Sequence, residues 1–187
     1  IKVDEREEKF IVTYTGTISE TYDLSGLIDA MKELDGSLLR QMKMRFVGKV
    51  PLFISERIKT ELPELELEMP GYVDHQKSVE YLLRSSLLLL VIPKVENNEG
   101  ILTGKFFEYL ASRKPILAIG PVNGDLANII GETKCGKIFD YSDTDGIRNF
   151  IQKNIQSEII TEERNIAQFS RKGLTEKLSQ RIIQTEK

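Results

Sequence analysis

Residues that commonly build metal and redox sites are scarce in this sequence. Its 187 residues include one cysteine, Cys135, and one histidine, His75. A lone cysteine excludes an internal disulfide framework and cannot by itself form a zinc site. This scarcity favours a reduced, cytoplasmic setting.

Long runs of one kind of residue are also missing. Twenty-six basic residues against twenty-nine acidic ones give a net charge of −3, and no basic run stands out. This balance argues against binding to nucleic acid or another polyanion. No apolar run is long enough to span a membrane, and we expect no signal peptide. There is also no internal repeat and no low-complexity tract.

The length and composition are those of one medium-sized domain. Hydrophobic residues make up 40% of the chain, and a domain of this size buries roughly 70% of the surface that its unfolded chain exposes. We expect residues 1–9, which are mostly charged, to be a linker, and residues 10–157 to form the folded domain. Residues 158–187 follow an amphipathic pattern, so we expect a helical segment that packs on this domain or on a partner domain.

The segment 86–120 organises the rest of the chain. Leu87–Ile92 is apolar at every position, which is typical of a parallel strand covered on both faces. The polar loop 94–103 therefore lies at the carboxyl end of that strand, where ligands of open α/β sheets bind. A helix from residues 103–104 to Arg113 follows, and then an apolar strand, Ile116–Ile119.

The first turns of this helix carry the candidate chemistry. Lys105 lies beside the free backbone N–H groups of the helix start, an arrangement that suits phosphate. Glu108 lies three residues later on the same side and suits a vicinal diol such as a ribose, because a carboxylate only accepts hydrogen bonds. The alternative is an exposed i, i+3 ion pair, which stabilises a helix by roughly 0.2–0.5 kcal/mol.

The remaining segments predict a doubly wound sheet. Strands are expected at 10–16, 43–48 and 137–139, and the alternating segment Glu64–Met69 is typical of an edge strand with its carboxylates in water. With 87–92 and 116–119 this gives about six strands in the order 3-2-1-4-5-6, a Rossmann-like α/β fold with helices on both faces. Helices are expected at 24–34, 53–62, 126–131 and 146–155, with one more containing 79–83.

Three polar residues or segments invite other functions. His75 follows Asp74 at a helix start, which favours an exposed or capping role over catalysis. Asp143-Thr144-Asp145 could hold a metal, but it directly precedes an apolar-periodic helix, where capping explains it. Lys49 could reach phosphate or be solvated.

The string from Gly104 to Ala118, GKFFEYLASRKPILA, resembles the donor-binding segment of GT-B glycosyltransferases. The resemblance is to family four, the glycosyl transferases of group 1, and extends less specifically over residues 10–180. It implies that this chain is the carboxyl-terminal half of such an enzyme and binds a UDP-, GDP- or ADP-linked sugar. It further implies transfer of a hexose in polysaccharide biosynthesis, with retention and without a metal or other cofactor.

The resemblance also assigns roles to residues. Lys105 would stabilise the departing diphosphate, and Glu108 would bind the ribose hydroxyls. The other donor-binding positions are Gly16, Thr17, Tyr72, Val73, Gly100, Ile101, Leu102, Thr103 and Gly104.

The chain departs from the family pattern at two places. Many relatives place an arginine and a lysine in the loop after the first strand, and here there is neither between Gly16 and Ala30. The family also has a glutamate eight residues before the ribose-binding one. That position is Gly100 here, and Glu99 is one residue away, so either the loop shifts its register or main-chain groups of residues 100–103 hold the sugar.

Three functions remain open at this stage. The first is a donor-binding domain that needs the amino-terminal acceptor domain for turnover, so this chain alone would be inactive. The second is another GT-B enzyme, such as a nucleotide-sugar 2-epimerase. The third is an inactive binding or scaffold module. Any membrane contact, at the inner face, would be made through the missing half.

Overall fold

The computed structural model describes residues 7–157 and five later positions, 166, 169, 173, 175 and 179. The predicted linker 1–9 therefore falls mostly outside the described residues. The same holds for the predicted helical segment 158–187. Of that segment, Ile166 and Phe169 pack against the core beside α5, Gly104–Ser112, and α6, Asp125–Thr133.

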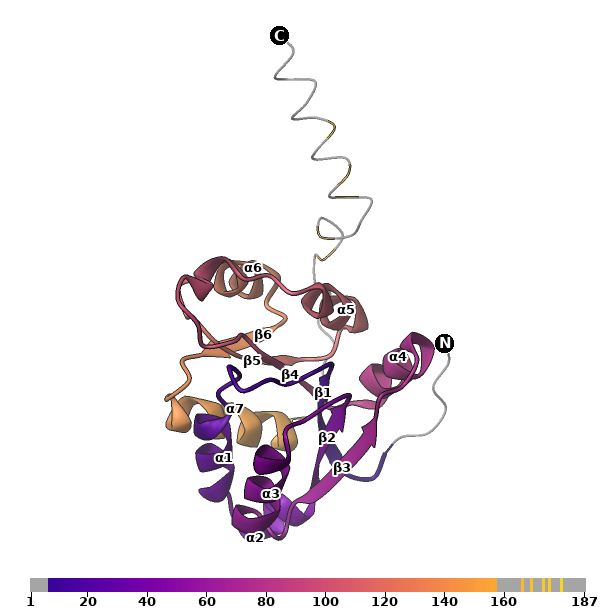
Figure 1. Cartoon of the computed structure of the whole chain (residues 1–187), viewed down its shortest axis with the longest axis vertical. Coiled ribbons are helices and arrows are strands. Elements are labelled where there is room, and N and C mark those ends of the chain that lie inside the picture. The colour runs from indigo at the N-terminus through magenta and orange to yellow at the C-terminus, as the bar shows by residue number, and fades with distance from the viewer. Residues whose placement is uncertain are drawn as a thin grey trace.

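The described part of the chain forms one parallel sheet of six strands, in the order β3-β2-β1-β4-β5-β6 (Figure 1). This confirms the predicted fold class and the predicted strand order. The strands are β1 Phe10–Thr15, β2 Met42–Val47, β3 Glu66–Gly71, β4 Leu87–Val91, β5 Ile116–Ile119 and β6 Gly136–Phe139.

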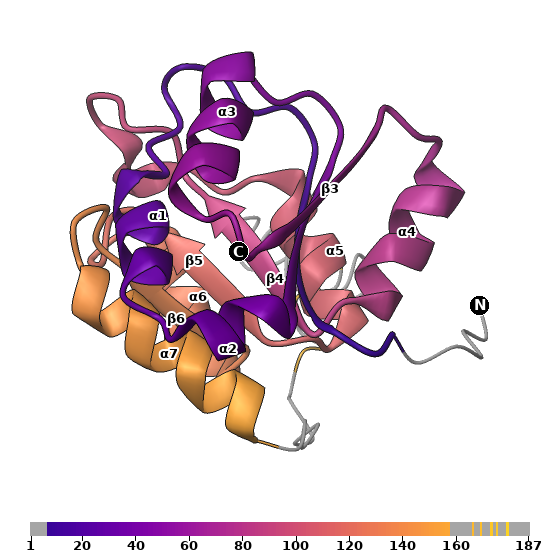
Figure 2. The same ribbon diagram turned by 90° about the horizontal axis from the view of Figure 1, so that it is seen from below.

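Helices cover both faces of this sheet (Figures 1 and 2). One face packs against α1 Ser25–Lys32, α2 Gly36–Arg40, α3 Leu52–Glu61 and α7 Thr144–Gln156. The other face packs against α4 His75–Arg84, α5 and α6. The sequence pattern did not predict α2, a helix of five residues whose N-cap is the Asp35 carboxylate, which accepts from Ser37 N.

Strand β4 is buried along its whole length, as its unbroken apolar run predicted. Leu87, Leu89 and Val91 belong to the core on the α1 side. Leu88 and Leu90 belong to the core on the α5 side. Because successive side chains of a strand point to opposite faces, only a strand covered on both sides needs an apolar residue at every position.

Strand β3 lies at the sheet edge, as predicted, but its carboxylates are not simply solvated. Glu66 and Glu68 lie beside Lys43 and Arg45 of β2 in register and form ion pairs with them. Arg45 is only 2% exposed and has its guanidinium 4.8 Å from the centre of the Tyr81 ring. The alternating glutamates therefore neutralise a buried cation on the neighbouring strand.

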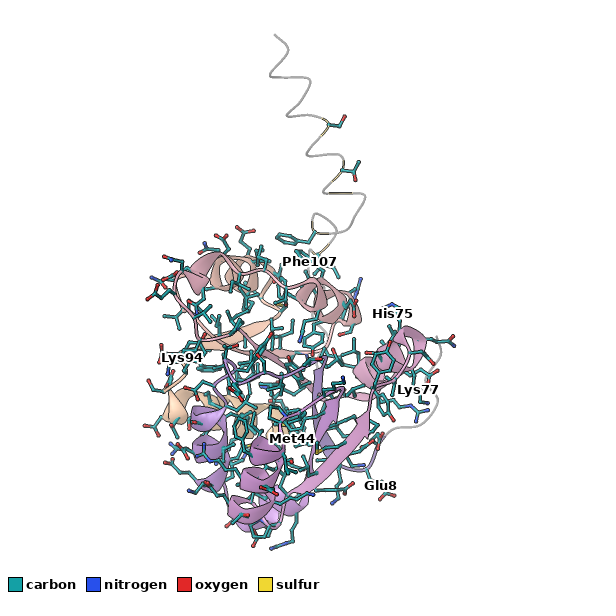
Figure 3. All side chains as sticks on the ribbon, viewed as in Figure 1. Glu8, Met44, His75, Lys77, Lys94 and Phe107 are labelled. Atoms are coloured by element: carbon teal, nitrogen blue, oxygen red, sulfur yellow. The ribbon has the colours of Figure 1, made fainter. Side chains whose placement is uncertain are left out.

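Two helix starts confirm the capping predicted for residues 143–145 and the exposed position predicted for His75. The Asp74 carboxylate accepts from Lys77 N at the start of α4, and the Asp143 carboxylate accepts from Gly146 N at the start of α7. His75 is the exposed first residue of α4 (Figure 3). These contacts explain the two segments as helix-starting signals.

Candidate functional site

Two glycines form the floor of the candidate site, where β1 and β2 end. Gly16 has φ +110° and Gly48 has φ +132°, values that L side chains rarely adopt. Gly16 N donates to the carbonyl oxygen of Val47 at 2.8 Å. A Cβ on Gly48 would lie 2.2 Å from the carbonyl oxygen of Gly16. The two backbones therefore approach more closely than any side chain would allow.

Replacing Gly48 with alanine is expected to lower the free energy of unfolding by about 2 to 4 kcal/mol, because it combines a strained φ with a backbone clash. Urea denaturation measures this change. Gly131 in α6 is the matched control, since a Cβ there meets nothing within 4 Å, and its replacement by alanine should stabilise the helix by roughly 0.5–1 kcal/mol. An unchanged unfolding midpoint for Gly48→Ala would contradict this packing.

Lys105 reaches over this floor from the first turn of α5. Its Nζ donates to the Tyr14 hydroxyl at 2.7 Å and lies 4.1 Å from the centre of the Tyr14 ring. A Cβ on Gly16 would lie 2.9 Å from the same nitrogen. The structure thus brings together Lys105 and Gly16, two predicted residues that are far apart in the sequence.

The charge of Lys105 is only weakly compensated. Burial lowers the pKa of its amine to about 8, and the nearby Glu108 carboxylate opposes this shift. Among the described residues no carboxylate forms an ion pair with it. An anion that bound here would stabilise the charged ammonium.

A second tyrosine ties α5 to β1. The Tyr109 hydroxyl is fully buried, accepts from Thr15 N at 2.9 Å and lies 3.2 Å from Thr15 Oγ1. Burial raises the pKa of Tyr109 to about 12, so the hydroxyl stays protonated. This contact holds the middle of α5 against the end of β1.

The amino terminus of α5 has no side-chain cap. Thr103 is its N-cap residue, but its hydroxyl makes no hydrogen bond to the helix. Its Oγ1 is buried without a partner in the described part of the chain. Backbone N–H groups at such a terminus attract anions. The start of α5 and the neighbouring Lys105 therefore both favour an anionic ligand.

Glu108 is exposed one turn below Lys105, and its charge acts on Lys105 and Tyr109. With Gly16, Gly48, Gly104 and Lys105 it makes up what we call the cradle. Two hollows of about 280 and 300 Å³ lie elsewhere, and neither includes Lys105 or Glu108. The cradle is therefore defined by the placement of its residues and not by a cavity.

A buried polar network fixes the loop between β4 and α5. Asn98 Nδ2 donates to the carbonyl oxygen of Pro93 at 2.8 Å and to the Tyr141 hydroxyl at 2.9 Å. The Tyr141 hydroxyl donates to the carbonyl oxygen of Ile92 at 2.9 Å. The predicted positions Gly100, Ile101 and Leu102 follow this anchor, and each is exposed or half-buried.

The other predicted residues lie at the same edge of the sheet but make fewer contacts. Thr17 is exposed, and its carbonyl oxygen accepts from the Tyr14 hydroxyl at 3.1 Å. Tyr72 is 87% exposed and Val73 is half-buried, both after β3, which β2 separates from β1. The structure does not bring them into contact with Lys105.

Some functional classes find no support in the part of the chain that the structure describes. It holds no group of three or more histidine, cysteine or acidic side chains arranged to bind a metal ion. None of its helices combines the length and apolar character that crossing a bilayer requires.

Comparison with protein families gives a match along most of the chain. Residues 1–173 match the family described as glycosyl transferases group 1. No curated protein matches the sequence significantly.

Solved structures share the fold at low sequence identity. WaaG, a glycosyltransferase involved in lipopolysaccharide biosynthesis, is 15% identical with a TM-score of 0.63, over 81% of this chain and 39% of its own. A TarM variant from S. aureus, solved with UDP, is 15% identical with a TM-score of 0.64, over 85% of this chain and 31% of its own. HepE from Anabaena, solved with UDP and glucose, is 15% identical with a TM-score of 0.57, over 80% of this chain and 39% of its own. The chain thus spans less than half the length of these three proteins.

Proposed function

Because the chain belongs to the glycosyl transferases of group 1 and has the Rossmann-like fold of a GT-B half, we propose that it is the donor-binding domain of a sugar transferase. Its substrate would be a UDP-, GDP- or ADP-linked sugar bound at the cradle. One observation carries the proposal. The half-buried Lys105 ammonium, without an ion pair among the described residues, lies over the glycine floor at the carboxyl edge of a parallel sheet.

The cradle supplies what the departure of a nucleoside diphosphate requires. Negative charge grows on the leaving diphosphate as its bond to the sugar breaks. The Lys105 ammonium and the N–H groups that open α5 are fixed donors near that position, and donors fixed in advance stabilise a transition state more than mobile water does. Glu108 would accept hydrogen bonds from the ribose hydroxyls and so orient the nucleotide. We propose transfer of a hexose with retention and without a metal or other cofactor.

The sugar would lie against the loop that Asn98 and Tyr141 hold in place. Gly100 has no side chain to offer, so main-chain groups of residues 100–103 are the proposed contacts. Tyr72 and Val73 would lie against the base, and Thr17 beside the donor.

The acceptor would bind to an amino-terminal half. UDP is bound by longer proteins, HepE and TarM, of which this chain spans 39% and 31%. We therefore propose that this chain alone binds donor but does not turn it over. A cytoplasmic location, with any membrane contact through the other half, stays a prediction.

A nucleotide-sugar epimerase and an inactive module are the other candidates. Gly100 and the missing basic pair after β1 favour an inactive module, whereas the position of Lys105 over Gly16 opposes it. Assay of the full-length protein separates the three, because only a transferase makes a glycosylated product and only an epimerase a changed sugar nucleotide.

A thermal-shift screen tests donor binding directly. At a concentration 10 to 100 times its Kd, a nucleoside diphosphate should stabilise the domain by about 1.4 to 2.7 kcal/mol. For a domain of this size that raises Tm by roughly 3 to 10 °C. The screen compares UDP, GDP and ADP, and the largest shift identifies the base. No shift with any of them at millimolar concentration would reject donor binding by this chain.

A further inference from the structure

One hydroxyl group, that of Tyr14, links Lys105 of α5 to the loop after β1. The Tyr14 hydroxyl accepts from Lys105 Nζ of α5 at 2.7 Å and donates to the carbonyl oxygen of Thr17 in the loop after β1 at 3.1 Å. Gly16, one of the two floor glycines, lies between Tyr14 and Thr17 in the sequence. The position of the ammonium therefore depends on a residue that no sequence pattern marked as functional.

The Tyr14 ring is itself held rigidly. It is 0% exposed and packs against Phe46 and Tyr22, with ring centres 6.2 and 6.5 Å away. A lysine has four rotatable bonds and ordinarily extends into water. Here its nitrogen lies 4.1 Å from the centre of the Tyr14 ring, which attracts a cation. Tyr14 thus offers Lys105 both an acceptor and an aromatic face.

We propose that Tyr14 is the positioning residue that holds the Lys105 ammonium over Gly16, and thereby determines where the donor phosphates bind. This inference rests on the proposed function. It would also account for phosphate binding without a basic pair after β1, because Lys105 of α5 places its ammonium at the end of β1. Tyr14 acts through Lys105 and does not itself touch the nucleotide.

The same contacts link phosphate binding to a proton. The titratable groups facing Lys105 Nζ are Tyr14 on β1 and Glu108 on α5, and Tyr22 and Tyr109 lie near Tyr14. Burial raises the pKa of Tyr14 far above its usual value and lowers that of Lys105 to about 8, so of this hydrogen-bonded pair only Lys105 titrates near pH 8. A diphosphate favours the ammonium, so its affinity is highest below the pKa of about 8 and falls as the pH rises above it.

A double-mutant cycle tests the proposal by equilibrium titration at pH 7.5. The probe is whichever of UDP, GDP and ADP binds the wild-type chain most tightly, with its monophosphate for comparison. Tyr14→Phe, which keeps the ring, should weaken diphosphate binding about tenfold, and Lys105→Met should weaken it more, by about 30- to 100-fold. Adding Tyr14→Phe to Lys105→Met should change the affinity by less than about twofold, because the lysine is then absent. Monophosphate affinity should change less in every variant.

The pH dependence of diphosphate affinity is a second test, because it would not change if Tyr14 had a purely structural role. Between pH 7.5 and 9.5 the wild-type affinity should fall around the pKa of about 8. Tyr14→Phe removes the acceptor that holds the lysine in its buried position, so the ammonium should be more exposed to water and the fall should move to higher pH. Tyr81→Phe, a tyrosine on α4 beside Arg45, is the control and should match the wild type.

Two kinds of result would contradict the proposal. An equal loss from Tyr14→Phe with and without Lys105, or an unmoved pH profile, overturns the positioning role while leaving donor binding intact. Wild-type binding to none of the three diphosphates overturns the proposed function and this inference together.

Discussion

Replacing Glu108 with alanine is expected to weaken nucleoside-diphosphate binding by about 10- to 100-fold, enough to abolish the thermal shift. A hydrogen bond to a charged group contributes about 1.5–3 kcal/mol. Glu108 is exposed one turn below Lys105, so its removal leaves no buried gap and should change the stability of the free domain little. Isothermal titration of wild type and variant measures the difference.

The role of Glu108 is separated from general charge effects by changing the ligand. If its carboxylate binds the ribose, the wild type should prefer the ribonucleotide to the 2′-deoxyribonucleotide, and Glu108→Ala should lose that preference. Glu132→Ala, an exposed glutamate on α6, is the matched control for lost negative charge. A variant that still distinguished the two sugars would show that another group reads the ribose.

Replacing Lys105 with methionine is expected to lower kcat of the full-length enzyme by about 100- to 1,000-fold, the range for losing one donor that stabilises transition-state charge. The alkyl chain of methionine keeps most of the packing against Tyr14, so stability should change little. Steady-state assay of donor turnover measures the loss. Lys153→Met, an exposed lysine on α7, should turn over at the wild-type rate. An active Lys105→Met enzyme would assign leaving-group stabilisation elsewhere.

Much of the fold followed from local pattern. The unbroken apolar run at 87–92 predicted a central strand because burial on both faces excludes polar side chains. The alternation at 64–69 predicted an edge strand for the opposite reason. Together they gave the observed strand order. Asp74 and Asp143 showed where two helices begin, since a capping carboxylate acts within three residues of its own position.

The contacts of the cradle could not be predicted in this way. Period-two alternation puts Tyr14 on the same face as Val12, but it does not say that Lys105, 91 residues later, donates to its hydroxyl. The contact between Tyr109 and Thr15 could not be predicted either, because the two residues are 94 positions apart in the sequence. Such pairs depend on how helices cross the sheet.

Ion pairs between strands and very short helices are equally hard to predict from local pattern. Glu66 and Glu68 alternate like solvated residues, but a neighbouring strand supplies Lys43 and Arg45 as partners. The five-residue α2 is too short for an apolar period to show. The roles given to Tyr72, Val73 and residues 100–103 stay predictions.

Amide NMR of the isotopically labelled chain, titrated with the nucleoside diphosphate that most raises its Tm, tests the central claim most directly. Binding at the cradle predicts that the amide signals of Gly16, Gly48, Gly104 and Lys105 shift together and saturate at one Kd. Unchanged cradle signals, with shifts confined to the charged residues around Arg45 and Tyr81, would contradict a phosphate site at the end of β1.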